Sequence, residues 1–314
     1  MPSVIFLDSV HDVLFEDLEK IGFECIWDEK NDLAFIAKNY PDIQGLVIRS
    51  RFVLNDQAID LFPNLKWVAR SGSGLENIDV EYCNKKQIKV FSSPEGNAEA
   101  VGEFVLGSIL SLIRKIPSGN STIRNNLWLR EEHRGIELSN QTVAIIGLGH
   151  MGKSVANKMK SIGCRILAHD IALKECPLSH VELVSLETIF DEADIISLHL
   201  PLTKETKEYA NHIFFKSFKK PIYFINTARG QHCVTEDLLD AIKNKKVLGA
   251  ALDVLEFEGT NLQLEQKDNM IYSRLIQENK ILLTPHIAGW TKESYYKLSK
   301  VLSNKITQSL VESS

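Results

Sequence analysis

The chain has 314 residues, of which 44% are hydrophobic and 25% charged, and its formal net charge is −5. This length is enough for about two domains, and the charge gives no electrostatic reason to expect a nucleic acid or an anionic membrane as a partner. The mean hydropathy is −0.09 and we expect no apolar run long enough to span a bilayer, which predicts a soluble protein.

The first residues, MPSVIFLDSV, have no basic region before their short apolar run, so they predict a β-strand and not a signal peptide. The five cysteines are odd in number, widely spaced and form no CxxC pair: Cys25, Cys83, Cys164, Cys176 and Cys233. This pattern argues against a disulfide framework and against a zinc site. We therefore expect a cytoplasmic protein that holds no metal.

Apolar strands alternate with helical segments along the whole chain. One group of strands is expected at residues 4–8, 45–50, 66–72 and 89–93, and a second group at 142–147, 165–170, 194–200, 222–228, 248–254 and 280–286. Strands this apolar are covered on both faces, which predicts parallel sheets with helices on each side. The expected fold class is α/β, with two doubly wound parallel-sheet domains.

A long apolar helix is expected at residues 98–116, between the two groups of strands, and a polar connection follows it. The final helix begins at about residue 291, after the last strand of the second group, and we expect it to return to the first group. The first domain is then discontinuous, with residues 1–96 and 291–314. Residues 97–290 form the second domain.

The stretch TVAIIGLGHMGKS indicates a strand, a glycine turn and a helix. Gly147, Gly149 and Gly152 match GxGxxG, in which the glycines allow a tight turn, close approach of a pyrophosphate and close helix packing. The next expected strand ends on Asp170, where a carboxylate binds ribose hydroxyls and repels a 2′-phosphate. We therefore predict NAD and not NADP. The alternative is that the glycines only make a turn and Asp170 only ends a strand.

Three polar clusters follow strands of the second group, where an open α/β sheet places its ligands. They are HLPLT (199–203), NTARG (226–230) and TPHIAGWT (284–291). Taken singly each is weak evidence, because histidines, arginines and carboxylates after strands are mostly structural or solvated. Their occurrence together beside a dinucleotide turn is what indicates an active site.

From VIRSR through SGSGLENID, SPEGNAEAVGEFVLG, GLGHMG, HLPLT, NTARG and GAALDVLEFE to TPHIAGWT, nearly the whole chain resembles the D-isomer-specific 2-hydroxyacid dehydrogenases. This family includes formate, D-lactate, glycerate and D-3-phosphoglycerate dehydrogenases. The resemblance implies a Rossmann NAD-binding domain inserted into a flavodoxin-like substrate domain. It also implies oxidation of a D-2-hydroxy acid by hydride transfer to NAD, in a homodimer.

Carried over to this sequence, the family's catalytic residues fall on Arg229, Glu258 and His286. An arginine binds the substrate carboxylate in bidentate fashion and polarises the forming carbonyl. A histidine takes the hydroxyl proton as hydride leaves, and a glutamate fixes the tautomer of that histidine.

The resemblance also gives the binding residues. Those expected at the cofactor are Gly147, Gly149, His150, Met151, Gly152, Asp170, His199, Pro201, Thr206, Thr227, Ala228 and Asp253. Those expected at the substrate are Arg49, Ser50, Arg70, Ser73, Gly74, Asn97 and Arg130, of which Asn97 is also a candidate for the cofactor. Several of these positions are equally consistent with turn and cap residues.

The prediction of the substrate depends on several arginines. Arg49 and Arg51 in VIRSR, with Arg70 and Arg130, together suit a phosphate, which takes bidentate guanidinium contacts, so we predict D-3-phosphoglycerate, at the start of serine synthesis. The alternative is that they are solvated surface arginines that bind no substrate. Phe52 stands where the family often has a small hydroxyl residue, and Gly259 replaces a frequent proline. Trp290 replaces the serine common in phosphoglycerate enzymes, and an aromatic residue there resembles erythronate-4-phosphate dehydrogenases.

Other activities stay open at this point. The substrate alternatives are glycerate, hydroxypyruvate, D-lactate and erythronate-4-phosphate. A different class of protein, an NAD(H)-binding regulator similar to a corepressor, would bind NADH but turn over none of these acids. The apolar helix at residues 98–116 is the expected dimer surface. We do not expect the C-terminal regulatory domain through which serine inhibits some phosphoglycerate dehydrogenases.

Overall fold

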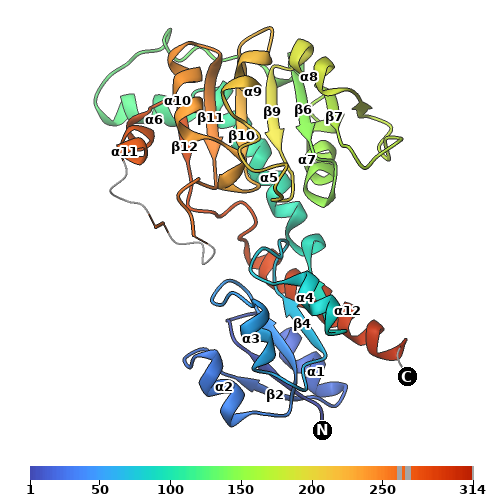
Figure 1. The fold of residues 1–314 in the computed structure, drawn as a ribbon. Helices are drawn as coiled ribbons and strands as arrows, with labels where there is room; N and C mark the ends of the chain where they lie inside the picture. Colours follow the sequence, from blue (N-terminus) through green and yellow to red (C-terminus); the bar gives the residue numbers. More distant parts are fainter. Residues whose placement is uncertain (260–263, 266–269, 313–314) are drawn as a thin grey trace. The chain divides into compact units, whose positions relative to one another are not determined.

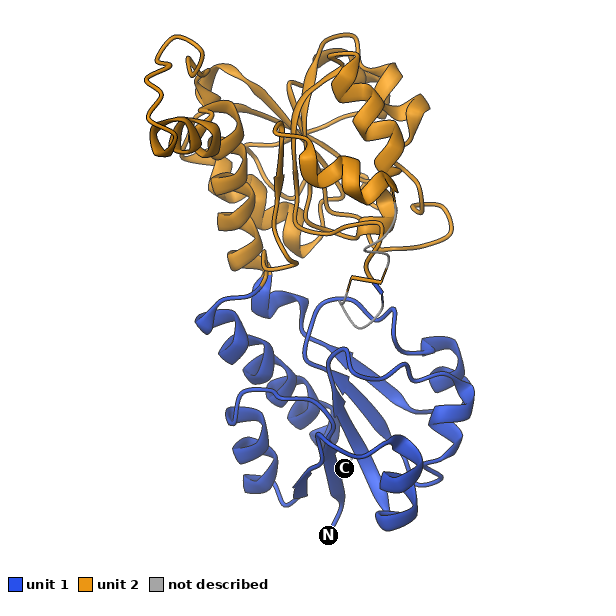
Figure 2. Ribbon diagram, turned by 90° about the vertical axis from the view of Figure 1, so that its left-hand side faces the viewer, with its two compact units in different colours: residues 1–97, 259–263, 290–314 blue, residues 98–258, 264–289 orange. Residues whose placement is uncertain are grey.

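The computed structural model describes residues 1–259, 264–265 and 270–312. The chain divides into two compact units (Figure 2). Unit 1 comprises Met1–Asn97, Gly259–Gln263 and Trp290–Ser314, and unit 2 comprises Ala98–Glu258 and Leu264–Gly289. Each unit contains one sheet in which every strand pair is parallel, so the predicted α/β class with two parallel-sheet domains is confirmed.

Unit 1 is built on five strands in the order β2-β1-β3-β4-β5, the order of flavodoxin-like folds. The strands are β1 (Ser3–Phe6), β2 (Glu24–Trp27), β3 (Ile43–Ile48), β4 (Trp67–Arg70) and β5 (Lys89–Ser92). The helices are α1 (Val13–Lys20), α2 (Leu33–Asn39), α3 (Asp56–Asp60), α4 (Val80–Lys85) and α12 (Lys292–Val311), which comes from the far end of the chain (Figure 1).

Alternating side chains of the strands in unit 1 pack on two opposite faces. On β1, Val4 and Phe6 belong to the core under α1 and α12, whereas Ile5 belongs to the core under α2, α3 and α4. Helix α12 contributes Leu302 and Ile306, which are 0% and 1% exposed. Burial of one such side chain is worth roughly 1.5–3 kcal/mol, so α12 is an integral part of unit 1.

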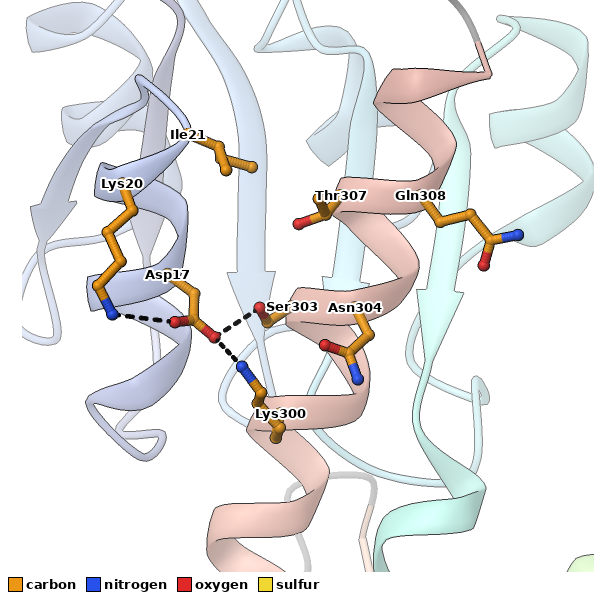
Figure 3. Close-up of a pocket in the computed structure, with 8 residues that line it drawn as sticks. All are labelled: Asp17, Lys20, Ile21, Lys300, Ser303, Asn304, Thr307 and Gln308. Carbon is orange, nitrogen blue, oxygen red and sulfur yellow. Dashed lines mark hydrogen bonds and ion pairs between the residues drawn. The ribbon is translucent and has the colours of Figure 1, made fainter.

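A polar cluster also joins α1 to α12 (Figure 3). The Asp17 carboxylate on α1 accepts hydrogen bonds from Lys300 Nζ at 2.6 Å and Ser303 Oγ at 2.8 Å on α12, and from Lys20 Nζ at 3.2 Å. These bonds, led by that from Lys300, lower the pKa of Asp17 from 3.8 to about 2. A shallow surface hollow lined in part by Asn304 lies over the cluster.

Unit 2 contains seven strands in the order β12-β11-β10-β9-β6-β7-β8, most of which are labelled in Figure 1. They are β6 (Thr142–Ile146), β7 (Arg165–His169), β8 (Glu182–Leu183), β9 (Ile195–Leu198), β10 (Ile222–Asn226), β11 (Val247–Leu252) and β12 (Ile281–Leu283). The helices are α5 (Pro94–Ile113, begun in unit 1), α6 (Ile116–Arg124), η1 (Leu138–Asn140), α7 (His150–Lys160), α8 (Leu186–Glu192), α9 (His212–Ser217), η2 (Gly230–His232), α10 (Thr235–Lys243) and α11 (Met270–Gln277).

The strand order of unit 2 is that of a Rossmann fold with one added edge strand. On β6, Val143 and Ile145 face the core with α5 and α7, whereas Ala144 and Ile146 face the core with α8 to α11. Chain order reverses between the neighbours β6 and β9, and such a switch point is where this fold binds ligands. The loops after β6 and β9 are therefore the first place to look for a site.

Helix α5 differs from the sequence expectation in two ways. It spans Pro94–Ile113 and not residues 98–116, and the connection after it contains the helix α6, which begins behind Lys115 at a left-handed φ of 53°. Among the described residues it is also the one helix long and apolar enough to cross a membrane, with a mean hydropathy of 1.2, which corrects the expectation that no run reaches that length. Core helices pass the same test, and 44% of this window is buried inside the protein.

Candidate active site

The glycine turn between β6 and α7 uses its glycines for different reasons. Gly147 has a φ of +93°, and a Cβ on it would lie 2.5 Å from the carbonyl oxygen of His199, while a Cβ on Gly152 would meet the carbonyl of Gly147. Gly149, the N-cap of α7, is different, because among the described residues other than its own chain neighbours no atom lies within 4 Å of the place of its Cβ. Two glycines are needed by the fold, and the third leaves open space at a helix N-terminus that fits a phosphate.

Asp170 follows β7 and turns its carboxylate toward the same glycine turn. Its Oδ2 accepts a hydrogen bond from the backbone N–H of Leu148 at 2.8 Å, and its Oδ1 accepts one from Ala172 at 2.9 Å. The negative charge is therefore fixed beside the turn. A ribose diol can pair with it, whereas a ribose phosphate would meet repulsion.

His199 follows β9, the strand on the other side of the switch point. Its Nε2 lies 2.8 Å from Ser197 Oγ, and burial lowers its pKa from 6.5 to about 4. The ring is therefore neutral near pH 7. In the loop that follows, Thr206 Oγ1 donates to the carbonyl of Pro201 at 2.6 Å and closes the loop on itself.

His232 is a site residue that the sequence analysis missed. It is 0% exposed, and its two ring nitrogens lie 3.0 Å from the carbonyl oxygen of Leu200 and 3.1 Å from that of Thr206. It thereby fastens the loop after β9 to the segment that follows Arg229. The signal in the sequence was a histidine two residues after NTARG.

The loop after β10 presents Arg229. Asn226, which is 0% exposed, accepts from the Ala228 N–H at 3.1 Å and donates from Nδ2 to the carbonyl of Arg229 at 2.8 Å. The Arg229 side chain donates from Nη1 to the carbonyl of Ala228 at 2.6 Å. The Thr227 hydroxyl is buried, and no hydrogen-bond partner for it is found among the described residues. Asn226, quoted with the motif but given no role, is the residue that holds this loop.

His286 and Glu258 form a hydrogen-bonded pair in unit 2. His286 Nδ1 lies 2.9 Å from Glu258 Oε2, and Glu258 Oε1 accepts from the Leu255 N–H at 3.1 Å. The two side chains are 25% and 13% exposed. In the part of the chain that the structure describes, no group bonds to His286 Nε2, so that nitrogen is available to a ligand.

Asp253 shapes the loop on which His286 lies. It is 1% exposed, and its carboxylate accepts from Thr284 Oγ1 at 2.6 Å, from the Ile287 N–H at 2.9 Å and from the Ala288 N–H at 2.7 Å. These bonds hold His286 in a left-handed conformation with a φ of 56°, which is unusual for a residue other than glycine. The expectation that Asp253 lines the cofactor stays a prediction.

In unit 1, five residues predicted to bind the substrate lie at or after the carboxyl ends of β3, β4 and β5. Arg70 donates from Nε to the carbonyl of Arg49 at 3.1 Å and from Nη1 to that of Gly74 at 2.5 Å, and Ser73 Oγ donates to Asn97 Oδ1 at 2.7 Å. Arg70 therefore shapes the loop that follows β4.

The remaining predicted residues are more dispersed. Ser50 is half-buried next to Arg49, and His150 and Met151 open helix α7. Arg130 is exposed on the segment after α6 and belongs to unit 2. Arg51 points into unit 1, where it donates to backbone carbonyls, including that of Asn31 at 2.7 Å, so its role is structural.

Comparison with known proteins fits this geometry. Residues 106–288 match the model of the D-isomer specific 2-hydroxyacid dehydrogenase NAD-binding domain. The chain belongs to this family. It is 34% identical over 282 residues to a hydroxypyruvate reductase of Thermotoga maritima, covering 90% of this chain and 89% of the relative. It is 31% identical over 315 residues to a D-3-phosphoglycerate dehydrogenase of Synechocystis, covering 99% of this chain but 54% of the relative.

A solved structure is similar over its whole length. The D-lactate dehydrogenase of Aquifex aeolicus, in complex with NAD and lactic acid, has a TM-score of 0.83 and is 27% identical, covering 99% of this chain and 96% of that one. The dehydrogenase is therefore an NAD-dependent enzyme of the 2-hydroxyacid family, as the sequence predicted. The open space at Gly149 and the carboxylate of Asp170 fit that cofactor.

Proposed function

We propose that the enzyme oxidises a D-2-hydroxy acid to the 2-oxo acid, and that Arg229, Glu258 and His286 perform the chemistry. The observation that carries the proposal is the His286–Glu258 pair. Nδ1 is bonded to a carboxylate that is itself held by a backbone N–H, and Nε2 is left for a substrate hydroxyl. The imidazole is thus oriented before the substrate arrives.

NAD, when bound, supplies the hydride acceptor for the hydrogen on C2. His286 Nε2 takes the proton of the C2 hydroxyl, and the electron pair of that O–H bond becomes the second bond of the new carbonyl. Glu258 stabilises the resulting imidazolium. Arg229 binds the substrate carboxylate and polarises the forming carbonyl oxygen with its guanidinium.

The cofactor is proposed to lie along the switch point of the sheet in unit 2. The N-terminus of α7, with Gly149, His150 and Met151, would hold the diphosphate, and Asp170 would hold the ribose. The other positions proposed to line it are Gly147, Gly152, His199, Pro201, Thr206, Thr227, Ala228 and Asp253.

D-3-phosphoglycerate, oxidised to 3-phosphohydroxypyruvate in serine biosynthesis, is the substrate that we propose. Support comes from the Arg49 guanidinium behind β3, which is half-buried and bonds within the described chain to a carbonyl and not to a carboxylate. Ser50, Arg70, Ser73, Gly74, Asn97 and Arg130 are the further residues proposed at the substrate. Glycerate, with hydroxypyruvate as its product, is the second candidate, because the similar hydroxypyruvate reductase matches over most of both chains.

Initial rates of NADH formation separate these substrates. D-3-phosphoglycerate, 4-phosphoerythronate, D-glycerate and D-lactate are offered at equal concentration with NAD. The proposal predicts a clear preference for D-3-phosphoglycerate. A preference for D-glycerate would keep the catalytic assignment and refute the phosphate assignment. Binding of NADH without turnover of any acid would refute the enzymatic proposal and favour a regulator.

We further propose a cytoplasmic homodimer that associates through α5. The half-buried Phe104, Leu106, Leu110 and Leu112 on this helix support an apolar contact. All five cysteines are free thiols, as is usual in a reducing compartment. Light scattering at working concentration tests the association, and a monomer would refute it.

A further inference from the structure

The backbone of Arg49 is fixed at the carboxyl end of the sheet in unit 1. Its N–H donates to Asp8 Oδ2 at 2.6 Å, and its carbonyl accepts from Arg70 Nε at 3.1 Å and from Asn77 Nδ2 at 3.0 Å. Three hydrogen bonds with other side chains thus fix the position of the Arg49 backbone. The guanidinium can therefore move only by rotation about the bonds of its own side chain.

The guanidinium of Arg49 lies over an aromatic ring. Its Cζ lies 4.3 Å from the centroid of the Trp290 ring, and its Nη1 donates to the carbonyl of Ser9 at 3.3 Å. Within the described chain no aspartate or glutamate side chain forms an ion pair with it. Burial lowers its pKa and the nearby Asp8 carboxylate partly offsets this effect, so the group stays charged. The result is a partly desolvated cation with hydrogen-bond donors to spare.

Trp290 is held in its turn by aromatic and polar contacts. Its ring meets that of Tyr295 at 5.9 Å between centroids and 67°, and the Tyr295 hydroxyl lies 3.2 Å from Ser9 Oγ. The ring of His11 packs edge-on against Tyr295 at 5.7 Å. Trp290 nevertheless stays 52% exposed. The indole is therefore held in place by its neighbours and still exposed to solvent.

We propose that Trp290 is a positioning residue that presents Arg49 to an anionic group at the far end of the substrate from C2, with Tyr295 as its brace. This inference rests on the proposed function. A guanidinium held over a ring face loses less side-chain freedom when an anion binds. It also has one dry face, which strengthens its pairing with phosphate or carboxylate.

Kinetics with two substrates test this role. Trp290→Ala should raise the KM for D-3-phosphoglycerate about tenfold with little change in kcat, and leave the KM for D-glycerate within about twofold. Trp290→Phe should restore part of the loss, because it keeps an aromatic face. Trp27→Phe is the matched control, since Trp27 stacks on Phe15 in the same unit, and it should change neither KM. Equal losses with both acids would overturn the proposal.

A binding measurement separates this inference from the proposed function. Inorganic phosphate is titrated into the enzyme without NAD while tryptophan fluorescence is recorded. We expect a saturable change in the wild type and in Trp27→Phe that is absent from Trp290→Phe and Arg49→Ala. No change in the wild type would overturn the inference even if phosphoglycerate is turned over. A change at Trp290 in an enzyme that oxidises no phosphorylated acid would refute the proposed substrate alone.

Discussion

The carboxyl ends of the two parallel sheets carry polar residues of different character. In unit 2, each group assigned to the chemistry is held by a buried or largely buried partner: Asn226 holds the Arg229 loop, Asp253 holds the His286 loop and Glu258, which is 13% exposed, holds the His286 ring. In unit 1, the Arg49 side chain rests on the half-exposed Trp290. Hydrogen bonds therefore fix the geometry of these residues in unit 2, whereas unit 1 presents a positively charged guanidinium that can bind different anionic groups.

This difference has a chemical reason. Hydride and proton transfer at C2 are the same for every 2-hydroxy acid, so their residues gain from a rigid arrangement of buried hydrogen bonds. Substrates of the family differ in the group beyond C2. A single stacked arginine is enough to discriminate there, because one desolvated charge pair changes affinity greatly.

The largest expected effect comes from His286 in unit 2. His286→Ala removes the proposed base, and we expect kcat to fall by about 10³-fold with every acid. The Kd for NADH, measured by fluorescence titration, should stay nearly unchanged. Retained turnover would show that the rigid pair in unit 2 is not the catalytic one.

A contrast between two glycines sharpens the account of the cofactor turn. Gly149→Ala should fold normally, because its Cβ meets only open space, but should weaken NADH binding by about tenfold, since that space is where a phosphate belongs. Gly147→Ala should lower the thermal midpoint instead, because it has a positive φ and a Cβ there would clash with the His199 carbonyl. Thermal melts and NADH titrations of both variants test these two roles. Normal NADH affinity in Gly149→Ala would contradict the proposed phosphate position.

Asp170 tests the charge beside that turn. Asp170→Asn keeps an oxygen that can accept from the Leu148 N–H but removes the charge, and it should raise the affinity for NADPH relative to NADH by about tenfold. Asp170→Ala should shift the preference similarly and in addition lose the hydrogen bond to the turn. An unchanged preference in both variants would show that the carboxylate only supports the turn.

The smallest effect is expected for Asp17, which belongs to unit 1 and to none of the groups assigned to the chemistry. Because its folded pKa of about 2 lies below the ordinary 3.8, it stabilises the fold above about pH 4, and this contribution is lost as the pH falls toward 2. Lys300 is 40% exposed, so we expect only about 1 kcal/mol from this cluster. Asp17→Asn should lower the unfolding free energy at pH 7 and flatten its fall between pH 4 and 2. Urea titrations across this range that match the wild type would contradict the assignment.

Much of the fold was readable in the sequence, because strands buried on both faces are apolar throughout. All ten expected strands are present, β6 with Val143 to Ile146 being typical. The two strands that were missed, β2 (Glu24–Trp27) and β8 (Glu182–Leu183), lie at sheet edges and are partly exposed, and β8 has only two residues, so they lack that signal. The break after Ile113 was missed because a left-handed Lys115 leaves no sequence signal of its own.

The residues of the candidate site could be predicted from the sequence where family motifs include them. They could not be predicted where only tertiary packing determines their role. Glycine, histidine and glutamate at fixed spacings identified the turn and the His286–Glu258 pair. The supporting roles of Asn226 and His232 depend on which carbonyl oxygens lie opposite them, and this is set by tertiary contacts between loops far apart in sequence. The stacking of Arg49 on Trp290 joins residues 241 positions apart and could not be inferred from either residue alone.

We propose that unit 2 carries the chemistry and that Arg49 in unit 1 selects the substrate. The most direct test is the ratio of kcat/KM for D-3-phosphoglycerate to that for D-glycerate in the wild type, Arg49→Ala and His286→Ala. The account predicts that Arg49→Ala lowers the ratio about tenfold or more by losing only the phosphorylated acid, whereas His286→Ala abolishes turnover of both. An Arg49→Ala enzyme that loses both activities equally, or keeps the wild-type ratio, would contradict it.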